Sequence, residues 1–106
     1  MQQVRLVCSK YAVVKYAQLH QAGRVRADRE IVARAFGKAL RQSREQAGVS
    51  QEELAHLAHV DRTFVSRAER GVCQPALATV LLLAQALNVS AASLVATTER
   101  VLQPAE

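Results

Sequence analysis

The sequence predicts an all-α fold of five helices that follows an N-terminal extension. Half of the 106 residues are hydrophobic, which is enough for one domain with its own core and argues against wholesale disorder. The chain contains four glycines and two prolines, and its content of Ala, Leu, Arg, Glu and Gln favours helix over strand. From residue 29 onward, apolar residues recur every three to four positions, which is the helical period.

The N-terminal extension, residues 1–28, carries most of the excess positive charge. It holds five Lys or Arg and one acid, whereas residues 29–106 hold nine and eight. A helical stripe and short strands both fit its pattern, and we interpret it as helix from Val4, Val7, Tyr11 and Val14. Three roles are open for this extension. It is an arm that follows DNA phosphates, a segment that packs on the domain or across a dimer, or a passive appendage. The Tyr and Val content favours packing.

The first helix of the domain, residues 29–106, is expected from about Arg29 to Ala47. Val32, Phe36 and Leu40, continued by the segment that ends at Ala47, repeat at three to four residues and make one face apolar. Gly48 is expected to end this helix, since glycine adopts the left-handed conformation that closes a helix.

A second helix is expected from Gln51. Ser50 and Glu53 have the spacing of a capping box, in which the serine side chain accepts from the Glu53 amide and the glutamate reaches back to the cap. The residues that this helix should bury are Leu54, Ala55 and Ala58.

A third helix is expected to be capped by Asp61, to run to Arg70 and to be stopped by Gly71. Two short capped helices joined by a tight turn form the skeleton of a helix-turn-helix. At helical spacing, the third helix gathers polar residues on a largely shared surface: Arg62, Thr63, Ser66 and Arg67. The residues that turn the other way are Val65, Ala68 and Glu69. A polar face of this kind suits a DNA groove.

Two further helices are expected in the last third of the chain. Pro75 should open the fourth and Asn88 end it, with an apolar stripe of Leu77, Val80, Leu81, Ala84 and Leu87. Ser90 should cap the fifth. The apolar residues of the fifth helix are Leu94, Val95, Val101 and Leu102. They are more than a short terminal helix needs for its own core, and we interpret the surplus as a dimer surface.

Several functional classes find no support in the sequence. Cys8 and Cys73 form no CxxC pair, and the three histidines lack companion thiols at zinc-finger spacing, so we expect no metal and no cofactor. No phosphate loop, nucleophile elbow or paired carboxylates mark an enzyme.

No apolar run approaches the roughly 20 residues of a membrane span. The apolar start of the chain is broken by Lys10 and Lys15 and lacks a secretory core. We expect a cytoplasmic protein, associated with the nucleoid if the source is bacterial, with no membrane contact and no evident small-molecule ligand.

The segment from Phe36 to Leu94 resembles the phage-repressor and Cro-like (XRE-type) helix-turn-helix family, which includes the controller proteins of restriction–modification systems. The resemblance is carried by Leu40 and Arg44, by SQEELA, DRTFVSRAERG and Pro75, and by the closing ALNVSAASL, in the order and spacing of the family. Together these motifs are specific, although an isolated SxxE or ERG would be common by chance.

The resemblance implies roles for individual residues. Gln51 matches a glutamine that typically binds a DNA phosphate and can brace the recognition helix. Arg44 and Glu69 match a salt bridge that orients the recognition helix. The positions from which the family reads base edges or neighbouring phosphates are Arg62, Thr63, Ser66 and Arg67. The backbone of Val72, Cys73 and Gln74 lies where the family offers amides to phosphate. Without the resemblance, these residues would be read as a solvated polar surface.

The implied function is that of a sequence-specific double-stranded DNA-binding transcriptional regulator that binds a two-fold operator as a homodimer. The alternative is an antitoxin or protein-interaction adaptor on the same fold, which would have no need for Gln51, Arg62 and Arg67 on a DNA-facing surface.

The sequence departs from the family pattern at two positions. His59 stands in the turn where glycine is common, and a non-glycine residue at positive φ costs about 1 kcal/mol. Ala76 stands where Ser or Thr often caps the fourth helix, which weakens the start of that helix.

Overall fold

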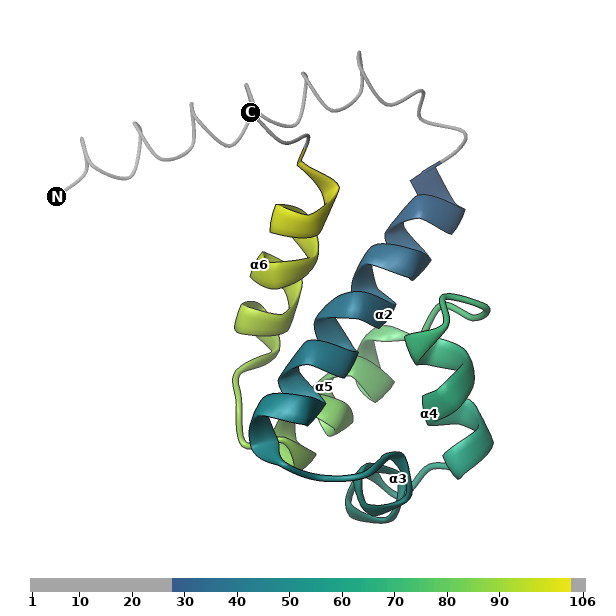
Figure 1. Cartoon of the computed structure of the whole chain (residues 1–106), viewed down its shortest axis with the longest axis vertical. Coiled ribbons are helices and arrows are strands. Elements are labelled where there is room, and N and C mark those ends of the chain that lie inside the picture. Colours follow the sequence, from purple (N-terminus) through teal and green to yellow (C-terminus); the bar gives the residue numbers. More distant parts are fainter. Residues whose placement is uncertain (1–27, 104–106) are drawn as a thin grey trace, which may run out of the picture.

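The computed structural model describes residues 28–103, which fold into five helices (Figure 1). In chain order they are α2 (Asp28–Ala47), α3 (Gln51–Ala58), α4 (Arg62–Glu69), α5 (Leu77–Ala86) and α6 (Ala91–Leu102). The described residues contain no strand, and the predicted all-α class is confirmed. The helix expected within residues 1–28 lies outside the described residues, apart from Asp28, with which α2 begins.

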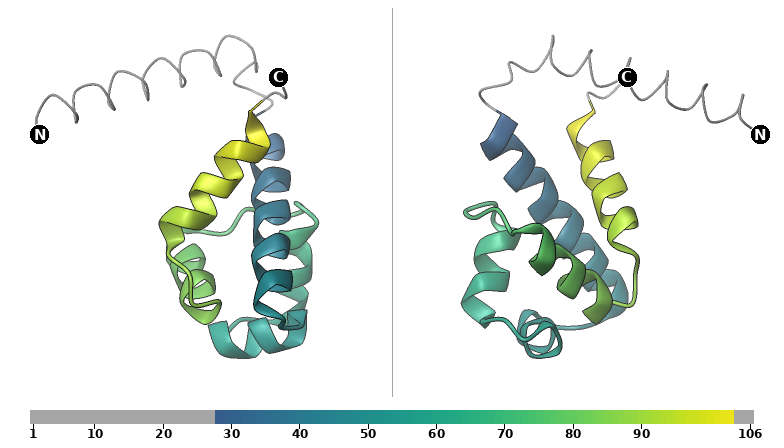
Figure 2. Two further views of the ribbon diagram at one scale, coloured as in Figure 1. Left: turned by 60° about the vertical axis from the view of Figure 1, so that its left-hand side comes forward. Right: turned by 180° about the vertical axis from the view of Figure 1, so that it is seen from behind.

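The long helix α2 is the scaffold of the fold. Helix α6 runs antiparallel beside it, and α4 packs against another side of α2, as Figures 1 and 2 show from three directions. The short helix α3 contacts both α4 and α5, and α5 in turn contacts α6. Helices α3 and α4 therefore sit at one end of the molecule, held in place by longer elements.

The core lies where the five helices meet. Its largest fully buried side chains include Leu40 from α2, Leu54 from α3 and Leu83 from α5, each with no exposed surface. Burial of such a side chain contributes about 1.5–3 kcal/mol. Leu54, Ala55 and Ala58 are all buried, as the sequence predicted for the second helix.

The predicted apolar stripe of the fourth helix is wrong in part. Val80, Ala84 and Leu87 are buried, but Leu77 is 71% exposed and Leu81 48% exposed. Leu83, which the stripe omitted, is fully buried. The physical reason is that α5 reads LATVLLLAQA, with Leu on several faces, so that hydrophobic spacing does not distinguish the buried face from the exposed one.

The capping predictions have different outcomes. The capping box is confirmed: the Glu53 amide donates to Ser50 Oγ at 3.0 Å, and the Ser50 amide donates to Glu53 Oε1 at 2.9 Å. Ser90 caps α6 by accepting from the Ser93 amide at 3.0 Å. Asp61 is the N-cap residue of α4, as predicted, although its side chain accepts no capping hydrogen bond.

The start of α5 also differs from the prediction. Pro75 does not open the helix, because Ala76 is the N-cap residue and Leu77 the first helical one. Ala76 has extended dihedral angles but no side-chain oxygen to accept from the helix amides. The start of α5 therefore lacks a side-chain capping bond, as expected for alanine at a position where the family often has Ser or Thr.

His59 adopts the left-handed conformation expected of it, with a φ of 60°. It closes α3 and donates its backbone N–H to the carbonyls of Ala55 and His56. Histidine is thus tolerated in a turn that favours glycine.

Within the described residues, none of the single helices is long and apolar enough to cross a membrane. Helices α5 and α6 pass that test only when taken together, and they are bent by 107° at the break between them.

The caps give a prediction for stability. Ser50→Ala should lower the free energy of unfolding by about 1 kcal/mol, because α3 loses its capping oxygen. Ala76→Ser should raise it by up to about 1 kcal/mol, because the extended backbone at residue 76 already suits a serine cap. Urea unfolding of both variants checks the signs, and a change of the same sign in both would contradict the capping account.

Candidate nucleic-acid interface

The amino end of α3 and the polar side of α4 form one surface. Gln51 from α3 and Arg62, Thr63 and Ser66 from α4 line a shared hollow of about 250 Å³. Gln51 and Ser66 are 15 positions apart in the sequence but line the same hollow, because α3 packs directly on α4. The spacing of α4 alone predicted three of these residues together, and the family resemblance added Gln51.

Arg67 and Gln74 occupy other parts of the surface. Arg67 is exposed on α4 but does not line the hollow. Gln74 is exposed in the segment that connects α4 to α5. The structure therefore brings together four of the six residues expected at DNA and leaves these two outside the hollow.

Acidic residues lie on a separate part of α3. Glu52 and Glu53, with His56 and Leu57, line a second hollow that shares no residue with the first. Neither carboxylate of α3 lines the first hollow, so Arg62 is the charged residue there that a polyanion would meet.

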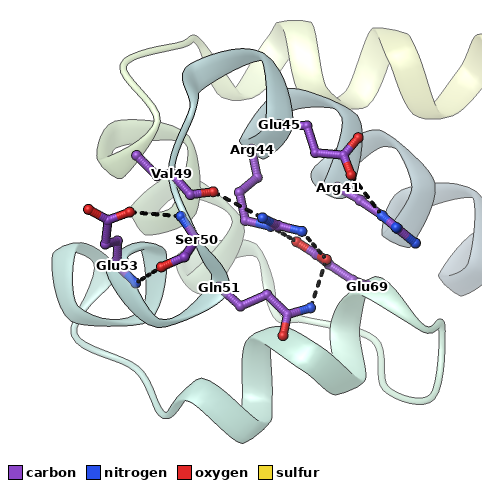
Figure 3. A network of polar contacts seen from close by, with 8 residues as sticks. All are labelled: Arg41, Arg44, Glu45, Val49, Ser50, Gln51, Glu53 and Glu69. Atoms are coloured by element: carbon purple, nitrogen blue, oxygen red, sulfur yellow. Dashed lines mark hydrogen bonds and ion pairs between the residues drawn. The ribbon is translucent and has the colours of Figure 1, made fainter.

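Behind the polar surface, Glu69 connects three helices (Figure 3). Its carboxylate accepts from Arg44 Nε at 2.6 Å and from Arg44 Nη2 at 3.1 Å, which is a bidentate pair between α4 and α2. It also accepts from Gln51 Nε2 of α3 at 3.0 Å. One carboxylate therefore fixes the mutual positions of α2, α3 and α4.

The pair is well shielded from water. The Glu69 side chain is 3% exposed and the Arg44 side chain 13% exposed. Arg44 also donates from Nη1 to the Val49 carbonyl at 2.9 Å, which anchors the loop before α3. The hydrogen bond to Glu69 raises the pKa of Arg44 above its ordinary value, although burial acts in the opposite direction. The ion pair therefore favours the charged form of Arg44.

Gln51 has donor capacity beyond this network. Its side-chain amide has two N–H groups, and the contact with Glu69 uses one of them. The amino end of α3 adds backbone N–H groups with no partner inside the helix and a favourable dipole for an anion. Gln51 can therefore brace α4 and present a donor to a phosphate at the same time.

Sequence reasoning missed the close approach of α2 to the carboxyl end of α4. Gly37 of α2 and Gly71 after α4 both lie where the backbones of these elements approach. The available signal was Gly37 itself, a helix-disfavouring residue inside an otherwise regular helical pattern.

The family description "Helix-turn-helix domain" matches residues 35–96, which is more than half of the chain and contains all of α3, α4 and α5. The chain belongs to the helix-turn-helix family. It shares the fold of the XRE-type DNA-binding transcription regulators, and the resemblance drawn from the sequence is confirmed.

Individual relatives support this assignment. The restriction-modification controller protein C.AhdI from Aeromonas hydrophila is 40% identical, with a TM-score of 0.58 over 58% of this chain and 94% of that one. The clp gene regulator ClgR from C. glutamicum is 28% identical, with a TM-score of 0.66 over 68% of this chain and 92% of that one.

A third relative is a proposed HTH-type transcriptional regulatory protein from Methanothermobacter thermautotrophicus. It is 38% identical over 53 residues, which cover 50% of this chain and 17% of that protein. The match therefore covers about a sixth of the length of that relative.

In the part of the chain that the structure describes, no group of three or more His, Cys, Asp or Glu side chains is arranged to hold a metal ion. Cys73 is a half-buried free thiol.

The Glu69 network gives a second prediction. Glu69→Ala should lower the free energy of unfolding by about 3 kcal/mol, because it leaves the shielded Arg44 without its partner. In a double-mutant cycle with Arg44→Ala, the two losses should not add. Urea unfolding of the wild type, the two single variants and the double variant measures the coupling. Purely additive losses would show that the ion pair does not contribute to stability. Arg41→Ala, which breaks only the exposed pair with Glu45, is the control.

Proposed function

We propose that the protein is a sequence-specific double-stranded DNA-binding transcriptional regulator, and not an enzyme, that acts as a homodimer on a two-fold operator. The observation that carries the proposal is the shared hollow of Gln51, Arg62, Thr63 and Ser66 at the junction of α3 and α4. A regulator of this kind acts where its DNA lies, which in a bacterial cell is the nucleoid. It needs no cofactor or small-molecule ligand for the contacts proposed below.

Helix α4 is the proposed recognition helix, placed in the major groove. Arg67 is exposed and projects from it, and an arginine there can pair in bidentate fashion with guanine O6 and N7. Thr63 can touch a thymine methyl group or a phosphate, and Ser66 a base edge. Arg62, in the first turn of α4, reaches either a base or a phosphate.

Phosphates on either side of the groove are the proposed partners of Gln51 and of the segment after α4. Gln51 offers its second amide N–H together with the amino end of α3. Gln74 is exposed in the connection to α5, next to the backbone amide of Cys73. The expectation for Val72 is wrong, because its amide already donates to the Arg67 carbonyl at 2.9 Å. Such contacts fix the register of the protein on the duplex without reading its sequence.

Exposed apolar residues on α5 and α6 support the homodimer. Leu77, Leu81 and Leu82 of α5 and Val95 of α6 are each more than 40% exposed. Burial of these side chains against a second copy would remove apolar surface from water. Symmetric subunits imply a two-fold operator with half-sites about 34 Å apart.

The base-reading role of Arg67 is tested with an operator duplex that the wild-type chain selects from a randomised pool. Arg67→Ala should weaken binding of this duplex by about 1–3 kcal/mol and flatten the preference at one base pair. Gln51→Ala should weaken selected and unselected duplexes alike, as loss of a phosphate contact would. Binding curves on single-base operator variants measure both effects.

An equal loss for Arg67→Ala on every variant would assign it to the DNA backbone. If the wild-type chain selects no duplex, the DNA-binding proposal fails, and the antitoxin or adaptor alternative takes its place.

The homodimer is tested by adding a charge to the exposed apolar face. Leu81→Glu should shift the protein from dimer to monomer in sedimentation equilibrium and weaken operator binding, because a buried unpaired carboxylate opposes association. Leu57→Glu is the matched control. Leu57 is exposed to a similar extent, 51% against 48% for Leu81, but it lies on α3, outside the proposed dimer surface. Two variants that dimerise as the wild type does would exclude this part of α5 from the interface.

A further inference from the structure

Two glycines bring α2 into backbone contact with the carboxyl end of α4. A Cβ atom on Gly37 of α2 would lie 2.5 Å from the main-chain oxygen of Glu69 and 2.6 Å from that of Ala68. Gly71 follows α4 with a φ of 75°, and a Cβ atom there would lie 2.7 Å from Cγ and 2.8 Å from Cα of Arg34. Cβ atoms essentially never approach other atoms closer than 3.0 Å, so neither position accepts a side chain without displacement.

Local preference does not explain Gly37. Glycine in a helix interior is destabilising relative to alanine, so a helix such as α2 gains nothing from it as an isolated element. The atoms that it meets are main-chain carbonyl oxygens, which do not rotate away as the tip of a side chain does. A Cβ atom at residue 37 must therefore displace the last turn of α4 relative to α2.

We infer that Gly37 and Gly71 are positioning residues that set the distance and tilt of α4 relative to α2. Glu69 connects this contact to the proposed DNA surface. Its main-chain oxygen faces Gly37, and its carboxylate holds Arg44 and Gln51. A displaced last turn moves the carboxylate away from Gln51 and misaligns α4 with the amino end of α3. The inference rests on the proposed function for its DNA readout.

The first test is Gly37→Ala in the full chain, with the selected operator duplex as probe. Operator affinity should fall by about tenfold or more, the equivalent of one lost base contact. Affinity for an unselected duplex should change by less than about threefold, because long-range attraction to phosphates tolerates a small displacement. At an uncrowded position alanine would raise the melting temperature. A higher melting temperature together with unchanged operator affinity would overturn the inference.

A second pair of variants decides the question if Gly37→Ala does not fold. Gly71 and Gly48 both have a φ of 75°, but a Cβ atom on Gly48 would meet nothing within 4 Å. Asparagine tolerates the left-handed conformation at both sites. Gly71→Asn should lose about tenfold or more in operator affinity and Gly48→Asn less than about threefold. Equal losses would overturn the inference.

A readout without DNA separates this inference from the proposed function. The side-chain amide signals of Gln51 in NMR spectra report its contact with Glu69. These signals should shift in Gly71→Asn and remain in place in Gly48→Asn, whether or not the protein binds a duplex. Unchanged Gln51 signals in Gly71→Asn would overturn the positioning role, even if the chain proves to be a DNA-binding regulator.

Discussion

The arrangement of the proposed DNA surface depends on the carboxylate of Glu69. Helices α3 and α4 have eight residues each, and isolated helices shorter than about 12–15 residues are marginal in water. Their geometry must therefore come from tertiary contacts. Glu69 supplies three of these at once, because it binds Arg44 of α2 through two nitrogens and Gln51 of α3 through one. Displacement of this one group would affect both elements that face the proposed groove.

The Glu69 network is better understood as orientation than as net stabilisation. Removal of two charged groups from water is costly, and the attraction between them returns much of that cost only when the geometry is good. Apolar packing of Leu40, Leu54 and Leu83 supplies the favourable free energy without direction. The bidentate pair adds direction, since a planar guanidinium accepts a carboxylate in few arrangements. The buried leucines thus supply stability, and the Arg44–Glu69 pair supplies the orientation of the helices.

Sequence reasoning predicted features that depend on neighbouring residues. The capping box of Ser50 and Glu53 and the left-handed His59 need only a few residues of chain, and the pattern of α3 correctly assigned its buried face. The approach of Arg44 to Glu69, 25 residues later, was inferred only through resemblance to a family. Spacing within α2 or α4 does not contain that information.

The errors occurred where spacing carries little information. In α5 apolar residues lie all round the helix, so the choice between Leu81 and Leu83 for the core was made by packing against its neighbours. The closeness of Gly37 to Glu69 is a property of two helices, and residue type alone indicates only that something unusual occupies that position.

The exposed residues of α4 and the contacts behind this helix differ in how well they tolerate substitution. This difference bears on how a regulator of this fold changes its target. Arg62, Thr63, Ser66 and Arg67 are at the surface, and none is part of the buried cluster that joins the helices. Replacement of these side chains alters what α4 presents without disturbing its position. Gly37, Gly71 and Glu69 lie behind α4, where an added Cβ atom would collide with α2 or α4 and a lost carboxylate would leave the shielded Arg44 unpaired. Under the proposed function, base preference can therefore change through the exposed residues of α4 only as long as the contacts behind the helix stay the same.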